Sequence, residues 1–236
     1  MEFTTIFHYF EVKHQTVLDY PQAIRSALKP FLASTSFTIT NENTLKQRID
    51  LNSSSDYYKI ISLHDRTVFR CEESLESLLS PSALVGELFF DLISKLIEAQ
   101  AIGKPLHVLH YSIVLKKVDC SSELEVANKI RERYFTPELD KLSSDYTSFH
   151  IDITEKKYDE GHISAYRIGP FNYRDIIEAN GYEVMRESSL LEIRESFFEY
   201  LEIKLFNDIQ STSLNFSYYK KLTQQAIDKA NEVWKI

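Results

Sequence analysis

The chain has 236 residues, of which 43% are hydrophobic and 26% are charged, a composition typical of a globular protein with a sizeable core. Its formal net charge is −8 and its calculated pI is about 5.4, so net charge does not indicate binding to nucleic acid or to an anionic membrane, although it leaves room for a local basic patch. Five glycines in the whole chain argue against glycine-rich phosphate loops and flexible linkers.

The features that report on the cellular compartment favour the cytoplasm. Cys71 and Cys120 are far apart and match no metal-binding spacing, so we expect two reduced thiols. The N-terminus lacks the basic region and apolar run of a secretory signal. The longest apolar helix that the sequence predicts carries four charged residues, which is too many for a membrane span. We therefore expect a soluble, cytoplasmic protein without contact to a membrane.

The first eighty residues predict one helix among short strands. Residues 6–12 alternate as in a strand. A helix follows from Asp19, with Pro21 in its first turn, where the missing N–H costs little. Polar turns then separate four further segments that are rich in strand-forming residues, at 37–40, 45–51, 58–63 and 67–70.

The segment 82–118 predicts a long buried helix that leads into a long strand. Leucines recur at every fourth residue from Leu84 to Leu96, with further apolar residues beside them, so the apolar stripe is wider than a surface helix needs. Ser82 suits the start of this helix, and Gly103 and Pro105 suit its end. Residues 106–115 are then rich in strand formers.

The second half continues with a helix whose Ser122 and Glu125 form a capping-box pattern. Residues 149–153 and 162–168 predict a hairpin, and 216–234 predict a final helix with an apolar stripe. Residues 192–206 fit both periodicities: the alternation around 201–205 suits a strand, whereas an apolar residue at every fourth position suits a helix. We favour a strand late in this stretch and leave the choice between strand and helix over 190–206 open.

Both halves of the chain share one order of elements: strand, helix, several antiparallel strands, helix. The string Ser-Ser-Asp-Tyr occurs at 54–57 and again at 143–146, and these four matching residues leave a duplication open. We expect an α+β fold with mainly antiparallel sheet under long covering helices, in which two similar β-α-β-meander-α halves are an open alternative. No Ser/Gly linker separates the halves, so we expect residues 1–236 to form one compact unit, with candidate halves at 1–103 and 104–236.

This layout resembles an uncharacterised prokaryotic family of α+β proteins. The resemblance lies in the order of elements and in the region from Tyr57 to Val118, where a hairpin, a buried helix and a long strand follow one another. The central strand of this family typically has an arginine-rich sequence. Here the corresponding residues, 107–111, are His-Val-Leu-His-Tyr. The resemblance implies a fold and brings no activity with it.

The strongest catalytic pattern is Glu-x-Lys on a strand, as in metal-dependent nucleases of the restriction-enzyme type. Asp175, Glu202 and Lys204 fit this pattern: the two acids would bind Mg²⁺, and the lysine would position water or stabilise the developing negative charge. Glu155 and Lys157, with Asp145 or Asp152 upstream, and Glu11 with Lys13 match it too. Three matches in a charged chain show that Glu and Lys alternating on the solvent-exposed face of a strand produce this pattern without any catalytic role.

The histidines do not predict a metal site. His107 and His110 share a strand, but their odd spacing places them on opposite faces. The other five show no His-x-His or His-Glu-x-x-His spacing. Cys71 lies beside two glutamates, which raise rather than lower a thiol pKa. We predict no cofactor, and Mg²⁺ only under the nuclease alternative.

Aromatic residues are abundant, with 14 Tyr, 15 Phe and one Trp. Several occur as adjacent pairs, and on a strand one member of such a pair faces away from the core, where exposed rings suit a protein interface. Single-stranded nucleic acid would need basic residues interleaved with the rings, and the basic clusters visible in sequence are short. We therefore predict a non-catalytic interaction or accessory subunit of a larger prokaryotic protein assembly, with protein partners that include further copies of itself as an option. The alternative is a divergent metal-dependent nuclease.

Overall fold

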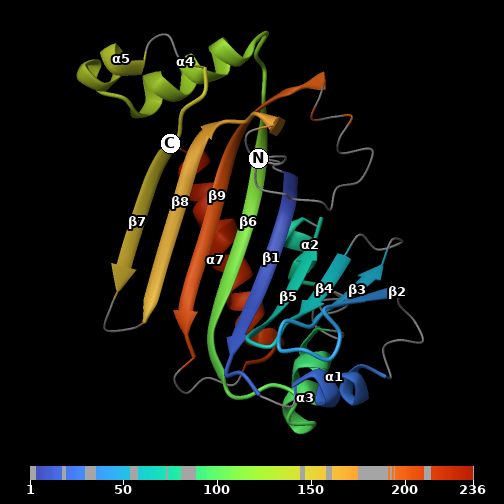
Figure 1. Cartoon of the computed structure of the whole chain (residues 1–236). Helices are drawn as coiled ribbons and strands as arrows, with labels where there is room; N and C mark the ends of the chain where they lie inside the picture. Colours follow the sequence, from blue (N-terminus) through green and yellow to red (C-terminus); the bar gives the residue numbers. More distant parts are fainter. Residues whose placement is uncertain are drawn as a thin grey trace.

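The structure is a computed structural model, and it describes residues 4–17, 20–29, 36–53, 58–72, 74–80, 89–143, 147–157, 161–174, 191, 193, 195–209 and 214–235. Nine strands make one sheet in the order β2-β3-β4-β5-β1-β6-β9-β8-β7, and every neighbouring pair is antiparallel. Figure 1 shows the sheet from the side opposite to α7. The strands are β1 (Thr4–His14), β2 (Ser36–Thr40), β3 (Arg48–Ser53), β4 (Tyr58–Ser62), β5 (Arg66–Cys71), β6 (Pro105–Val118), β7 (Ile151–Lys157), β8 (His162–Pro170) and β9 (Phe197–Asp208).

The expected class, an α+β fold with long covering helices and two similar halves as an alternative, is wrong. Most of the molecule is the single antiparallel sheet, and among the described helices only α7 is longer than twelve residues. Two of the described helices that cover the sheet, α1 and α3, have nine residues each, so the cover consists of short helices apart from α7. The helices are α1 (Tyr20–Leu28), α2 (Leu75–Leu78), α3 (Phe90–Glu98), α4 (Glu123–Tyr134), α5 (Pro137–Ser143) and α7 (Phe216–Trp234).

Several individual expectations are confirmed. The stretch that fitted both periodicities contains the twelve-residue strand β9, because its alternate residues Leu201, Ile203 and Leu205 face the helices and the residues between them face the other way. The strand after Gly103 is the fourteen-residue β6, which pairs with β1 on one side and β9 on the other. Ser122 caps α4, with its side chain accepting from the Glu125 N–H.

Gly103 has a different role from the expected left-handed cap. The residue with positive φ at this helix end is Gln100. Gly103 instead allows a close approach to the end of β1: its N–H donates to the Gln15 carbonyl, and a Cβ at position 103 would lie 2.7 Å from the Gln15 Cβ. The connection into β6 is therefore held against the chain that leaves β1.

Some expectations fall on residues outside the described ranges. These are the starts of the first two predicted helices at Asp19 and Ser82, the Ser-Ser-Asp-Tyr string at 54–57, and all but Ser143 of its counterpart. The assignment of residues 1–236 to one unit, with halves at 1–103 and 104–236, stays a prediction. No helix in the described part of the chain is both long and apolar enough to cross a membrane.

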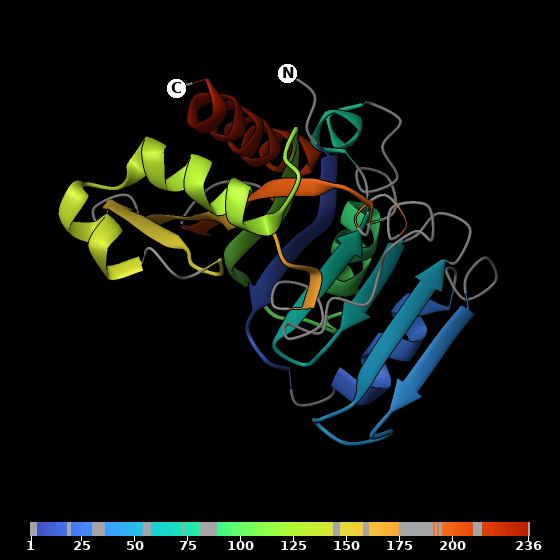
Figure 2. The same cartoon turned by 90° about the horizontal axis from the view of Figure 1, so that it is seen from above.

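The two faces of the sheet differ. The covered face packs against α1, α3 and α7 and forms the main core (Figures 1 and 2). The helix α7 contributes a continuous apolar stripe there, with Leu222, Ala226 and Ala230 all buried. The opposite side, which we call the open face, carries a second and smaller apolar cluster around Phe7, Ile113 and Tyr200, against which Phe171, Tyr173 and Ile193 pack.

Candidate binding surfaces of the sheet

The strand register brings residues from separate parts of the chain together on the open face. Lys204, Tyr111, Tyr9, Arg70 and Lys59 are register partners in turn, from β9 through β6, β1 and β5 to β4. We call these five residues the cation–aromatic row. The Lys204 Nζ lies 4.7 Å from the centroid of the Tyr111 ring, and the Arg70 guanidinium carbon lies 5.4 Å from that of Tyr9. Both distances are in the range of cation–π contacts.

Glu202 and Lys204 lie on this open face and pair with each other. Arg167 on the neighbouring strand β8 places its Nη1 3.6 Å from the Glu202 carboxylate and donates from Nε to Asp152 at 2.7 Å. That hydrogen bond holds the pKa of Asp152 below its usual range. The single carboxylate of Glu202 therefore sits between two cations, which balance its charge.

The third residue of the nuclease pattern, Asp175, lies outside the described residues. Within the described ranges, no group of three His, Cys, Asp or Glu side chains is placed to hold a metal ion. A Mg²⁺ site at Glu202 would need Asp175 and another oxygen ligand, because the positive charges of Arg167 and Lys204 repel a metal cation there. The nuclease alternative stays a prediction that depends on Asp175.

The two other Glu-x-Lys matches lie apart. Glu11 and Lys13 are on the open face of β1, where the Glu11 carboxylate accepts a hydrogen bond from Tyr9 and lies 3.8 Å from the Arg66 Nη1. Burial, followed by the contact with Glu11, raises the pKa of the Tyr9 hydroxyl. Glu155 lies on the edge strand β7, on the opposite face from Asp152, and Asp145 lies outside the described residues.

The two histidines of β6 face opposite ways, as predicted. His107 lies half-buried on the open face, with its ring centroid 4.6 Å from that of Phe206. His110 is fully buried under α7, where its Nε2 lies 3.2 Å from the Thr223 hydroxyl. The pleat of the strand explains the difference.

His110 belongs to a buried polar cluster that sequence analysis did not predict. His8 on β1 is fully buried beside it, with Nε2 2.8 Å from the Tyr219 hydroxyl and Nδ1 3.2 Å from the Ser112 hydroxyl. Burial lowers the pKa of His8 well below its usual value and that of His110 to about 3. Both rings are therefore neutral at physiological pH, and the cluster joins β1, β6 and α7 inside the core.

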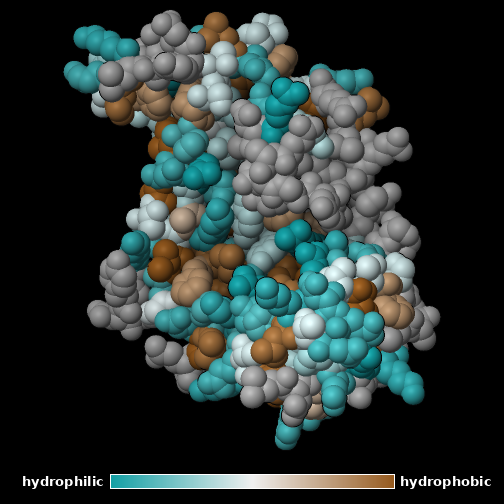
Figure 3. Space-filling model, viewed as in Figure 1, coloured by the Kyte–Doolittle hydropathy of each residue, from teal (hydrophilic) through white to brown (hydrophobic). Residues whose placement is uncertain are grey.

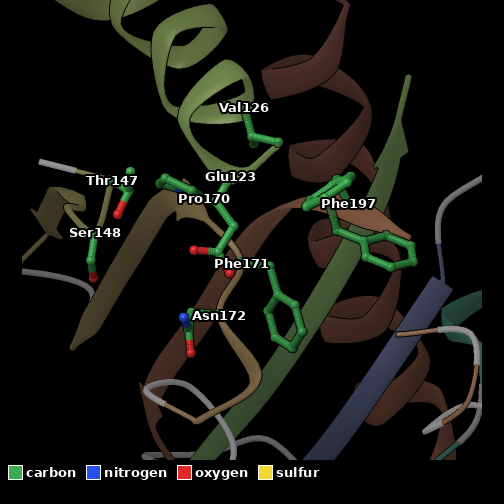
Figure 4. Close-up of a pocket in the computed structure, with 9 residues that line it drawn as sticks. Glu123, Val126, Thr147, Ser148, Pro170, Phe171, Asn172 and Phe197 are labelled. Carbon is green, nitrogen blue, oxygen red and sulfur yellow. The ribbon is translucent and has the colours of Figure 1, made fainter. Parts of the chain in front are cut away.

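A small cavity lies where α4 meets the ends of β8 and β9. It has a volume of about 20 Å³, and its lining includes Glu123, Ser148, Phe171, Asn172 and Phe198. The lining comes from four separate stretches of chain, at residues 123–126, 147–148, 170–172 and 197–198 (Figure 4). The volume is enough for about one water molecule and too small for an organic ligand.

The two edges of the sheet differ in chemistry. The edge strand β7, Ile151–Lys157, carries Asp152, Glu155 and Lys156, and charges of this kind discourage further strands from pairing. The edge strand β2, Ser36–Thr40, reads Ser-Phe-Thr-Ile-Thr and carries no charge. All of its residues except the half-buried Ile39 are exposed, and Phe37 retains 46% of its surface. Within the described part of the chain, β2 therefore lacks the charged side chains that protect the edge at β7.

Sequence analysis predicted neither the cation–aromatic row nor the exposed edge at β2. The members of the cation–aromatic row lie in five different strands, so no local pattern marks them, and only the strand order brings them together. The uncharged stretch 36–40 was visible, but its position at an edge was not. No protein-family model matches this chain, and no curated protein matches it with significant similarity. The resemblance to an uncharacterised family accordingly stays a prediction.

Proposed function

We propose that this chain is a non-catalytic interaction subunit of a larger protein assembly, and that it joins a second copy of itself through β2. The single observation that carries this proposal is the uncharged, exposed edge strand Ser36–Thr40, in contrast with the charged edge at β7. Strand addition to an exposed edge is a recurrent way for proteins to associate, because the main-chain hydrogen bonds of the edge are ready to be made.

The sequence of β2 is self-complementary. An antiparallel pair centred on Thr38 would place Phe37 opposite Ile39 of the second copy, and Ser36 opposite its Thr40. Aromatic residues opposite β-branched residues, and Thr opposite Ser or Thr, are favourable cross-strand pairs. The symmetry is a simple two-fold axis, as in most homodimers.

The test compares two edge threonines that are both exposed and both point to the open face, Thr38 on β2 and Thr154 on β7. In Thr38→Lys, two lysines would lie directly opposite each other across the two-fold axis, and like charges at that position destabilise pairing. Multi-angle light scattering after size exclusion should show a dimer for the unsubstituted chain and for Thr154→Lys, and a monomer for Thr38→Lys. A monomer for the unsubstituted chain over the whole concentration range, or equal association of the two variants, contradicts the proposal.

A further inference from the structure

The open face is basic although the chain is acidic. By strand register it carries nine Lys or Arg side chains and five carboxylates within the described residues. The remainder of the chain then holds 18 basic and 30 acidic residues. The nine cations are Lys13, Arg48, Lys59, Arg66, Arg70, Lys117, Lys156, Arg167 and Lys204, and the five carboxylates are Glu11, Asp50, Asp152, Glu202 and Asp208.

The carboxylates of this face mostly lie beneath the cations. The Glu202 side chain is 8% exposed, whereas its partner Lys204 is 43% exposed. Glu11 is 10% exposed beside Arg66 at 38%, and Asp50 is 15% exposed beside Arg48 at 41%. Asp152 and Asp208 are the exceptions: the Asp152 side chain is more exposed than that of Arg167, and Asp208 is exposed at the end of β9. The buried acids hold the basic side chains in position, and the charge presented to solvent is positive.

Two cations of the open face, Lys13 and Arg70, form no close ion pair with a carboxylate of the described residues, although the charge of Lys13 acts on Asp65. Arg70 lies against the ring of Tyr9, and its Nε is a buried donor without a hydrogen-bond partner in the described structure. A phosphate or a nucleobase acceptor that reaches Arg70 would therefore meet a charge that no acid of the described chain neutralises.

Aromatic and apolar side chains lie between these cations. In Figure 3 apolar side chains gather over the lower parts of β8, β9 and β6, with hydrophilic ones around them. The register places Ile163, Phe206 and Leu109 side by side on these strands, and the ring of His107 lies against Phe206. These side chains and Tyr9 are half-buried, so each ring keeps an accessible surface.

We infer that the open face binds single-stranded nucleic acid. The bases stack on the rings of Phe206, His107 and Tyr9. The phosphates lie at Arg70, Lys204 and Lys13. Single strands are bound on surfaces where aromatic rings alternate with cations, because every base has a face that can stack. A duplex would offer this flat face its phosphates only, and the apolar centre would gain nothing. The cation–aromatic row crosses five strands, or four strand spacings of ~4.8 Å, roughly 19 Å in all, which suits a short stretch of nucleotides. The inference is independent of strand pairing at β2.

The test measures fluorescence anisotropy of labelled oligo(dT) and oligo(U) of about 12 nucleotides. We expect dissociation constants of about 1–100 μM at ~50 mM salt, weakening steeply towards ~200 mM. A duplex of equal length and a poly-glutamate peptide should bind at least ten-fold more weakly. Binding of either competitor as tightly as the single strand would overturn the inference, and so would the absence of oligonucleotide binding at the lower salt concentration.

Variants separate charge from stacking. Arg70→Gln with Lys204→Gln should lose at least ten-fold in affinity and reduce the slope of log affinity against log salt by about 1.4, since each cation contributes about 0.7 on a single strand. Phe206→Leu should lose about ten-fold with an unchanged slope, because it removes a stacking ring and no charge. The matched control is Lys221→Gln with Lys235→Gln, two exposed lysines at α7 on the covered side. Equal losses in the control and the first variant, at unchanged circular dichroism, overturn the assignment to this face.

Discussion

The imidazoles of His8 and His110 lie edge to face with their centroids 4.8 Å apart, and neither ring has any exposed surface. Ser112, Tyr219 and Thr223 supply the polar contacts of the pair. A fully buried histidine pair of this kind is stable only when both rings are neutral, because burial penalises the charged form and the two positive charges would repel.

Acid should therefore destabilise the protein before its carboxylates titrate. The pKa of each ring is lowered in the folded state, so the unfolded chain binds more protons, and the free energy of unfolding falls as pH drops below about 6.5, the value of an unfolded histidine. Urea unfolding at several pH values between about 7 and 5 should show this loss. Each ring contributes up to about 1.4 kcal/mol per pH unit in that window.

Replacing one ring identifies the source of this pH dependence. His110→Asn should reduce the slope of unfolding free energy against pH by up to about 1.4 kcal/mol per unit. His150→Asn is the control, since His150 is half-exposed beside Asp152. Parallel pH profiles for the unsubstituted chain and His110→Asn would show that the buried pair does not cause the effect.

A buried ion pair should matter more than an exposed one. Glu199 is 1% exposed and accepts from Arg133 through both oxygens, at 2.9 and 3.1 Å. Arg133→Met leaves this carboxylate buried without its partner, which we expect to lower the free energy of unfolding by about 3–5 kcal/mol. Lys129→Met breaks a solvent-exposed pair with Glu125 and should lower the free energy of unfolding far less, because water screens that pair. Similar losses in both variants, by chemical denaturation, would contradict this reading of Glu199.

The connection into β6 offers a test of packing. In Gly103→Ala the new Cβ would meet the Gln15 Cβ at 2.7 Å and its carbonyl oxygen at 2.9 Å, so the backbone at the end of β1 must move. We expect a loss of about 1–3 kcal/mol in unfolding free energy. Lys104→Ala changes the exposed neighbouring residue and should be nearly neutral. An unchanged melting temperature in Gly103→Ala would show that the two segments separate at little cost.

The nuclease alternative has its own measurement. With Arg167 and Lys204 beside Glu202, we expect no Mg²⁺-dependent cleavage of single-stranded or duplex DNA above the level of a Glu202→Gln variant. Gel analysis of labelled DNA at millimolar Mg²⁺ decides this. Cleavage by the unsubstituted chain that disappears in both Glu202→Gln and Asp175→Asn would establish the alternative instead.

The sequence predicted individual strands and their faces better than their assembly. Alternation around Leu201 to Leu205 and the odd spacing of His107 and His110 were sufficient, because the pleat of a strand is a local property. The placement of β1 between β5 and β6 was not predictable, since it depends on pairing between residues about a hundred positions apart, such as His8 and Ser112. The cation–aromatic row depends on that order of strands, so it could not be predicted either.

The expectation for Gly103 failed because this residue has another role in the structure. Glycine after a helix commonly adopts a left-handed conformation, but here Gln100 does so and Gly103 is needed for its lack of a Cβ. The apolar content of the region before residue 103 predicted a long helix, whose described part contains the nine-residue α3 and whose predicted start at Ser82 lies outside the described residues. Net charge was also a poor guide to the open face, because the acids Glu11, Asp50 and Glu202 are at most 15% exposed, whereas their partners Arg66, Arg48 and Lys204 are 38–43% exposed.

The central position of β1 has a consequence for synthesis on the ribosome. Strands β1 to β5 can pair as soon as residue 71 has emerged, but the other side of β1 has no partner until β6, residues 105–118, is available. During that interval the nascent chain displays an unpaired strand edge that includes Phe7 and Phe10, both fully buried later. Exposed strands of this kind are sites of misassociation in partly folded chains. Slowing translation before residue 105 should therefore increase the chain's dependence on chaperones, whereas slowing it after residue 208, when β9 is available to pair with β6, should not.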